Sequence, residues 1–157
     1  MAKTNKTVGD DPKALEKKWG EKTIKVEGWT GFPNLLLERQ QALKLDPIKL
    51  NILLVLMKHW WRGNDWAYPS KQTIADIIGR DRSTVQKHIR EMEKQGLISR
   101  GKRHHSSGGQ STNLYDLSGL VTKLQKFADE LAATKEKRKE EDGRKRRGRA
   151  VVESDLS

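Results

Sequence analysis

Ser83, Gln86, Lys87 and Arg90 recur at a spacing that places them along one side of an α-helix. Amide and guanidinium groups can each form two hydrogen bonds with the edge of one base, and hydroxyl and ammonium groups can bind phosphate oxygens. Together these residue types are suited to reading double-stranded DNA. A surface helix with a solvated polar face would carry the same residues, so this segment alone leaves both interpretations open.

The polar residues lie within a predicted helix over residues 82–95. Asp81 suits the N-cap, because its carboxylate can accept a hydrogen bond from the first turn. Gly96 suits the left-handed position just beyond the end. Apolar residues recur on the opposite side at helical spacing and predict a buried stripe. This stripe consists of Val85, Ile89 and Met92.

The charge of the chain is positive and unevenly distributed. The 157 residues carry a net charge of +11, and residues 80–103 hold eight Lys or Arg against three acidic residues, a balance of +5. A surface of this kind attracts a polyanion such as DNA. We expect no membrane partner, because no apolar run approaches the roughly 20 residues of a transmembrane span.

The residues that could support catalysis or metal binding do not form a recognisable set. The chain has no cysteine, and His104 and His105 have no acidic neighbours in sequence. The glycines at 108–109 lack the lysine and helix that follow a phosphate-binding loop. We therefore expect no enzyme activity, no cofactor and no metal. The start of the sequence lacks the apolar core of a signal peptide, so we expect a cytoplasmic protein.

The N-terminal arm, residues 1–32, is expected to be disordered in part and helical in part. Within it, residues 23–29 alternate apolar and polar types, which predicts a short strand or an extended segment packed on the domain. Pro33 then begins a predicted helix through Leu43, whose leucines would cap the core or contact a second copy.

The central part of the sequence has the spacing of a helix-turn-helix. A long helix follows Asp46 and Pro47, and its apolar residues recur every three or four positions. A second helix begins at Ser70 and ends before Gly79. Only a short glycine-containing turn separates the second helix from helix 82–95, which is the arrangement of a helix-turn-helix.

A β-hairpin is predicted after helix 82–95. Residues 97–105 and 111–117 have the pattern of two strands joined by a Gly- and Ser-rich tip, and residues 66–68 could add a brief third strand. The basic side of this hairpin would lie beside helix 82–95 and grip DNA as a wing. The gripping residues would be Lys102, Arg103 and His104.

Residues 44–118 resemble the winged helix-turn-helix domain of plasmid and phage replication initiators and related small DNA-binding regulators. The matching segments are HWW at 59–61, YPSKQTIA at 68–75, RSTVQKHI at 82–89, KQGLI at 94–98 and NLYDL at 113–117. The resemblance implies a mainly α fold with a small β-hairpin, and it implies DNA binding.

The winged helix-turn-helix domain, residues 33–118, is followed by a predicted C-terminal helix over residues 119–142 and a disordered basic tail over residues 143–157. Apolar residues of the helix follow a three-four spacing that fits either packing on the domain or a dimer contact. They are Leu120, Leu124, Phe127 and Leu131. The basic cluster at 144–149 could add non-specific phosphate contacts or serve only solubility.

Our hypothesis is a sequence-specific regulator of double-stranded DNA, either a transcriptional repressor or a plasmid or phage maintenance protein. It would act as a homodimer or as several copies on repeated sites. Helix 82–95 would read the major groove, and the start of the preceding helix would bind a phosphate. The residues expected at the DNA are Ser70, Lys71, Gln72, Arg82, Ser83, Thr84, Gln86, Lys87, Arg90, Lys102, Arg103 and His104.

Two alternatives remain open. A replication initiator would bind origin repeats with the same module. Initiators of this family usually continue into further replication domains, whereas we expect a stand-alone DNA-binding regulator. A winged helix can also serve as a protein-interaction scaffold, for which a basic, polar helix face is a poor fit.

Overall fold

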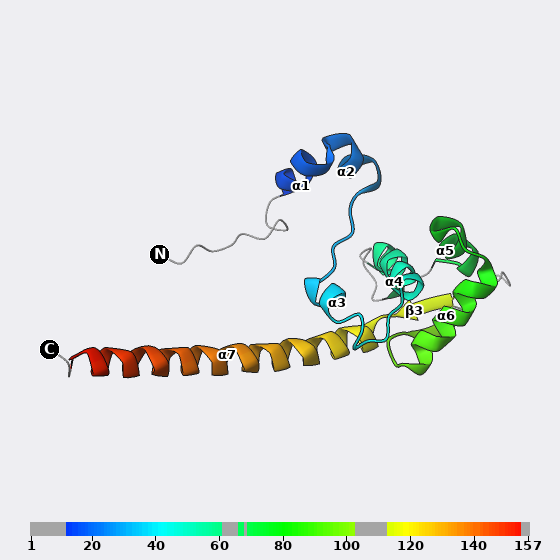
Figure 1. Cartoon of the computed structure of the whole chain (residues 1–157). Coiled ribbons are helices and arrows are strands. Elements are labelled where there is room, and N and C mark those ends of the chain that lie inside the picture. The colour runs from blue at the N-terminus through cyan, green and yellow to red at the C-terminus, as the bar shows by residue number, and fades with distance from the viewer. Residues whose placement is uncertain (1–11, 61–65, 68, 103–112, 155–157) are drawn as a thin grey trace.

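The computed structural model describes residues 12–60, 66–67, 69–102 and 113–154. Within these residues the elements follow in the order α1 (Pro12–Trp19), α2 (Glu21–Glu27), α3 (Asn34–Glu38), α4 (Pro47–Trp60), β1 (Trp66–Ala67), α5 (Lys71–Ile78), α6 (Arg82–Lys94), β2 (Ser99–Lys102), β3 (Asn113–Asp116) and α7 (Ser118–Ser154). Figure 1 shows a small domain around α4, from which α7 projects as a long rod while α1 and α2 stand off another side.

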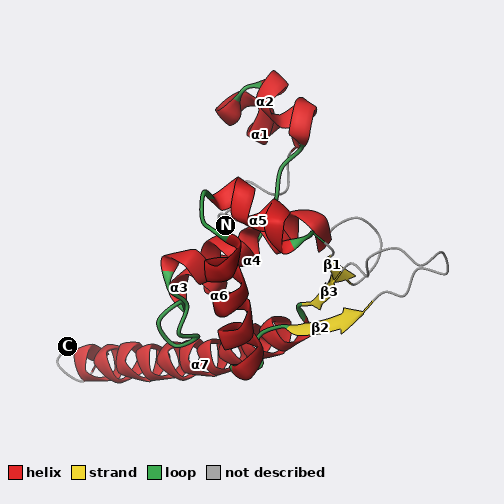
Figure 2. Ribbon diagram, turned by 90° about the vertical axis from the view of Figure 1, so that its right-hand side faces the viewer, coloured by secondary structure: helices red, strands yellow, loops and turns green. Residues whose placement is uncertain are grey.

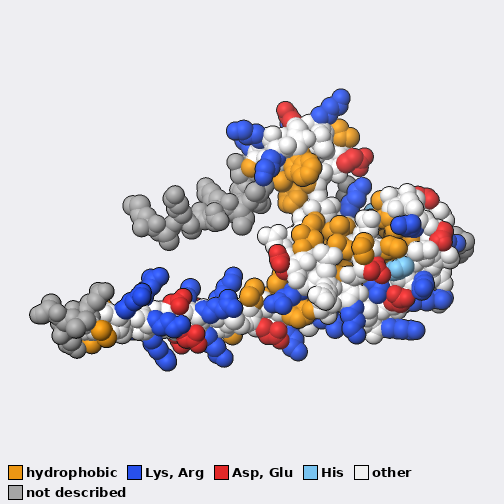
Figure 3. Space-filling model, viewed as in Figure 1, with side chains coloured by type: hydrophobic (Ala, Val, Ile, Leu, Met, Phe, Trp, Pro, Cys, Tyr) orange, Lys and Arg blue, Asp and Glu red, His pale blue; other side chains and the backbone are white. Residues whose placement is uncertain are grey.

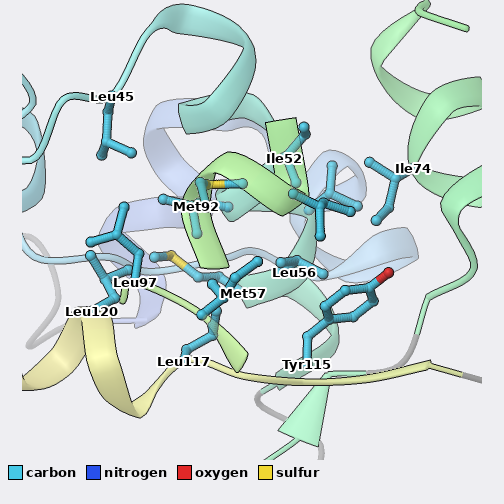
Figure 4. Packing of buried hydrophobic residues seen from close by; sticks show 14 of the residues in the cluster. Leu45, Ile52, Leu56, Met57, Ile74, Met92, Leu97, Tyr115, Leu117 and Leu120 are labelled. Atoms are coloured by element: carbon cyan, nitrogen blue, oxygen red, sulfur yellow. The ribbon is translucent and has the colours of Figure 1, made fainter. Parts of the chain in front are cut away.

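The hydrophobic core lies where α4, α5 and α6 pack against one another. Ile52, Leu53 and Leu56 of α4 are fully buried, so this helix runs through the centre of the domain. Tyr115 of β3 and Leu117 just beyond it close the core from the side of the sheet (Figure 4). The predicted central helix is therefore confirmed.

The sheet has three antiparallel strands in the order β1-β3-β2. Ser99 of β2 lies opposite Asp116 of β3, and Lys102 lies opposite Asn113. The brief third strand expected near residue 66 is present as β1, which pairs with β3. The expected fold class, mainly α with a small β-hairpin as in a winged helix-turn-helix, is confirmed. Figure 2 shows the hairpin and the far end of α7 on opposite sides of the domain.

The first turns of α7 pack on their own domain. A Cβ on Gly119 would lie 2.2 Å from the carbonyl oxygen of Gly96, so only glycine allows this close approach. The Leu120 amide donates a hydrogen bond to the carbonyl oxygen of Leu97 at 2.8 Å. Leu120 and Leu124 are buried in the core, and Phe127 packs against it. Of the two roles expected for the apolar residues of this helix, the structure shows packing on the domain for these three.

The strand expected over residues 23–29 is wrong, because the first five of these residues belong to α2. Glu21 and Lys25 are one helical turn apart and form an ion pair, which favours a helix. Ile24 is half-buried whereas Val26 is 69% exposed, so the alternating residues do not share one buried face.

The helix expected from Pro33 through Leu43 is shorter in the structure, because α3 ends at Glu38. The chain continues as turns, in which Lys44 adopts a positive φ of 54°. These turns place Leu43 and Leu45 in the core. Leu36 of α3 is also fully buried, so α3 caps the core as one of the two expected roles requires.

The C-terminal helix does not end at residue 142 as expected, because α7 continues to Ser154. The disorder expected for residues 143–157 is therefore wrong for the described part of this range, residues 143–154. Gly143 and Gly148 each cost about 1 kcal/mol relative to alanine, which a long helix tolerates. Acidic residues precede basic residues by four positions, an order that stabilises a helix. These pairs are Glu140 and Arg144, Glu141 and Lys145, and Asp142 and Arg146.

Gly119→Ala should lower the free energy of unfolding by about 1 to 3 kcal/mol, because the added methyl group would overlap the Gly96 carbonyl. Chemical denaturation followed by circular dichroism measures the change. Gly148→Ala is the matched control, since its added Cβ would have no atom within 4 Å apart from its chain neighbours and the backbone of its own helix, and it should leave stability unchanged or raise it. Equal stability of the two variants would contradict this docking of α7.

Candidate nucleic-acid interface

The turn between α5 and α6 fixes how these two helices meet. Gly79 ends α5 in the left-handed conformation with φ 68°, and the Arg80 amide donates to the carbonyl oxygen of Ala75 at 3.1 Å. A side chain at this φ would be strained, which explains the glycine. Asp81 follows as the N-cap of α6. The helix-turn-helix expected from the spacing is therefore present.

Asp81 collects the hydrogen-bond donors of the first turn of α6. Its carboxylate accepts the Thr84 amide at 3.3 Å, the Thr84 hydroxyl, and the Ser83 hydroxyl at 2.9 Å. The hydrogen bond from the Thr84 hydroxyl, followed by that from Ser83, lowers the pKa of Asp81. Ser83 and Thr84 were both expected at the DNA, and their hydroxyl hydrogens point back to Asp81. Only their oxygen lone pairs remain available to a ligand.

The outward face of α6 carries the other residues expected to read DNA. Gln86 is half-buried, and Lys87 and Arg90 are exposed. A shallow groove runs along this face and is lined by Ser83, Gln86, Lys87, Arg90, Glu91 and Lys94. In Figure 3, Lys and Arg side chains gather over α6 at the lower edge of the domain. The structure thus brings amide, guanidinium and ammonium groups together on one accessible face.

The acidic residue in this groove, Glu91, has a partner in the protein. The ammonium nitrogen of Lys49 on α4 lies 3.1 Å from Glu91 Oε2. Lys49 is only 7% exposed, and a buried ammonium group requires a partner. Glu91 therefore joins α6 to α4, and its charge is compensated before any phosphate approaches.

Four cations converge where α5, α6 and β2 meet. Lys71 is the first residue of α5, and its pKa is lowered by burial and then by the positive charges of Arg100, Arg82 and Arg90, while the Glu93 carboxylate offsets part of this effect. An anion at the same place would relieve this repulsion. The N-terminal amides and the dipole of α5 also favour an anion beside Lys71. The arrangement can therefore hold a phosphate group.

Two of the residues expected to bind phosphate already have partners. Ser70 is the N-cap of α5, and its hydroxyl oxygen accepts the Thr73 amide at 3.0 Å. The Gln72 side-chain amide donates to Asp76 Oδ1 at 2.8 Å. Both residues are exposed. Ser70 therefore positions the start of α5, and Gln72 would have to exchange its bond to Asp76 for a bond to DNA.

Arg100 was not among the residues expected at the DNA. From β2 its guanidinium group binds both carboxylate oxygens of Glu93 on α6, with Nη2 2.8 Å from Oε2. A bidentate pair of this kind is geometrically specific, so it fixes the first strand of the wing against α6. In the sequence, Glu93 stands out as an acidic residue near the end of a basic helix. Its partner could not be predicted, because the position of Arg100 depends on the path of the hairpin.

The remaining wing residues are only partly described. Lys102 ends β2, where its backbone pairs with that of Asn113. Arg103 and His104 lie outside the described residues. Their expected contact with DNA stays a prediction.

Within the described part of the chain, no three His, Asp or Glu side chains are grouped closely enough to hold a metal ion. Among the helices described there, none combines the length and the apolar character needed to cross a membrane.

Comparison with known proteins adds one finding. No curated protein matches the chain. Residues 43–98 match a family model described as a helix-turn-helix domain. The matched segment contains α4, α5 and α6, the helices that form the core and present the polar groove. The match and the geometry agree that residues 43–98 form a helix-turn-helix domain, a fold typical of DNA-binding proteins.

Proposed function

We propose that this protein is a sequence-specific regulator that binds double-stranded DNA and reads the major groove with α6. The observation that carries the proposal is the accessible polar and cationic face of α6, on a helix whose opposite face is buried. The match of residues 43–98 to a helix-turn-helix domain supports a DNA partner. The proposed role is binding alone, without catalysis.

Base readout would come from the middle of α6. The amide of Gln86 can form two hydrogen bonds with adenine, and the guanidinium group of Arg90 can do the same with guanine. Lys87 lies beside them and suits guanine or a phosphate. These three residues lie along the groove, so they could contact neighbouring base pairs.

The DNA backbone would be held beside α6 by cations of α5, of α6 and of the wing. Lys71 at the start of α5 would bind a phosphate together with Arg82 at the start of α6. Arg100, fixed by Glu93, lies in this same group of cations. The wing residues Lys102, Arg103 and His104 would bind the backbone or the minor groove. Ser83 and Thr84 would accept rather than donate hydrogen bonds.

Regulation would follow from occupancy of the site. One domain presents one recognition helix, which covers one half-site, so strong control requires a homodimer or several copies on repeated sites. Because Leu120 and Leu124 are buried in the domain, copies would meet through other surfaces or only through the DNA.

Selection of bound fragments from a random duplex library tests this function. We expect a short defined site to be enriched, with half-sites about 10 base pairs apart or a multiple of that if two copies bind together. Recovery of random sequence at physiological salt would contradict sequence-specific binding.

Replacing Gln86 or Arg90 with alanine should cost about 1 to 3 kcal/mol on the selected site and relax its preference at one or two base pairs, because each change removes a bidentate base contact. Competition titrations against single-base variants of the site measure the change. Gln125→Ala, on an exposed side of α7, is the matched control and should have no effect. An unchanged base preference in both α6 variants would exclude α6 as the reading element.

Affinity should fall steeply with salt, with a slope of log affinity against log salt of about −4 to −7 if about 5 to 8 phosphates are neutralised per protomer. Lys71→Gln should make the slope shallower by about 1 on selected and random duplexes alike, because it removes one phosphate contact. The measurement is a titration at several salt concentrations, with Lys22→Gln on α2 as an exposed control. An unchanged slope for Lys71→Gln would disprove the phosphate site at α5.

A further inference from the structure

The exposed part of α7 is a charged rod that no other described element covers. Leu120, Leu124 and Phe127 attach the helix to the domain. From residue 132 onward, every residue whose burial is described is exposed, except Gly143, which is half-buried. At 1.5 Å per residue, Arg149 lies about 33 Å along the helix from Phe127. Figure 1 shows this part of α7 projecting away from the domain.

Charge is distributed unevenly along this rod. Residues 135–142 hold four basic and four acidic residues, so their charges cancel. Residues 143–152 hold five basic residues and no acidic one. We call these five residues the basic collar: Arg144, Lys145, Arg146, Arg147 and Arg149.

The helix holds the basic collar at a fixed distance from the domain and points its cations in all directions. Successive residues of a helix are rotated by about 100°, so five cations within six positions surround the axis. Figure 3 shows Lys and Arg side chains projecting from both sides of α7. The Arg147 side chain also donates a hydrogen bond to the carbonyl oxygen of Gly143 at 3.2 Å, one turn earlier in the helix. Such a collar can meet a polyanion from any side, which suits contacts that ignore base sequence.

The composition of the rod argues against a helical protein partner or a lipid surface. No apolar residue lies between Ala133 and Ala150, so this stretch has no seam for a coiled coil and no face to insert into lipid. Uncompensated positive charge on a stretch without apolar residues, as at 144–149, is complementary to phosphates, which are bound mainly by charge. Val151 and Val152 are exposed beyond this stretch.

We propose that the basic collar is a second, sequence-independent binding site for DNA phosphates, separate from the groove on α6. The proposal takes DNA as the polyanion from the proposed function, but it does not depend on base readout by α6. Because the far end of α7 and the strands β2 and β3 lie on opposite sides of the domain (Figure 2), the collar contacts a different stretch of DNA from these strands. That stretch is either DNA flanking the site or a second duplex.

The test is a variant of residues 1–157 in which all five collar residues are replaced by glutamine. Its affinity is compared on a short duplex holding only the selected site and on one extended by about 20 base pairs on each side. We expect a loss of about 10-fold or more on the long duplex at low salt, a salt slope shallower by about 3 to 4, and a loss of less than about threefold on the short duplex. Circular dichroism checks that the helix remains.

A charge-matched control replaces five lysines of α1 and α2 with glutamine: Lys13, Lys17, Lys18, Lys22 and Lys25. This control removes the same charge from a different place and should lose much less affinity on the long duplex. Equal losses in the two variants would show a general effect of net charge and overturn the proposal. An unchanged affinity of the collar variant would overturn it as well.

Two further measurements separate the possible ligands. If the collar binds a second duplex, the natural protein should bring two labelled short duplexes together and the collar variant should not. If the collar variant loses binding only to vesicles of phosphatidylserine and phosphatidylcholine, the ligand is a membrane and the proposal is wrong. The variant carrying both Gln86→Ala and Arg90→Ala should keep the collar-dependent affinity for random duplexes, so failure of base readout and failure of the collar are distinguishable.

Discussion

The burial of Val85, Ile89 and Met92 fixes the rotation of α6 about its own axis. All three side chains are fully buried, and α6 packs on both α4 and α5. Gln86, Lys87 and Arg90 are therefore turned away from this buried stripe and line the groove. Burial of each of these apolar side chains stabilises the fold by about 1.5 to 3 kcal/mol. Rotating α6 by one residue would expose them, and the stability lost would exceed the stability gained from one new hydrogen bond. The core thus determines which side chains can meet DNA.

Electrostatic contacts then fix the surroundings of α6. Lys49 binds Glu91 on the side of α4, and Arg100 binds Glu93 on the side of the wing. Positive charge crowds around Lys71, whose pKa is lowered by burial and by the neighbouring arginines. A phosphate at this place would reduce the remaining repulsion among these cations. Such a surface is organised before DNA arrives, which limits the ordering required on binding.

The helix-turn-helix could be predicted because its signals are local: Ser70 and Asp81 are caps, and Gly79 takes a positive φ. Contacts between segments could not be predicted in the same way. The pairing of Arg100 with Glu93 and the approach of Gly119 to Gly96 depend on how the hairpin returns to the domain. The alternating pattern over residues 23–29 failed because a strand needs a neighbouring strand, whereas a helix forms its own hydrogen bonds. The basic tail beyond residue 142 was expected to be disordered, but the charge pairs at its start favour a helix.

Central to the proposed mechanism is the entry of α6 into the major groove. Methylation interference on the selected site tests this most directly, because dimethyl sulfate methylates guanine N7 in the major groove and adenine N3 in the minor groove. Methylation at N7 of the contacted guanines should block binding, and Arg90→Ala should abolish that block at the guanine it contacts. Interference confined to adenine N3, or the same N7 pattern for Arg90→Ala and the natural protein, would contradict readout by α6.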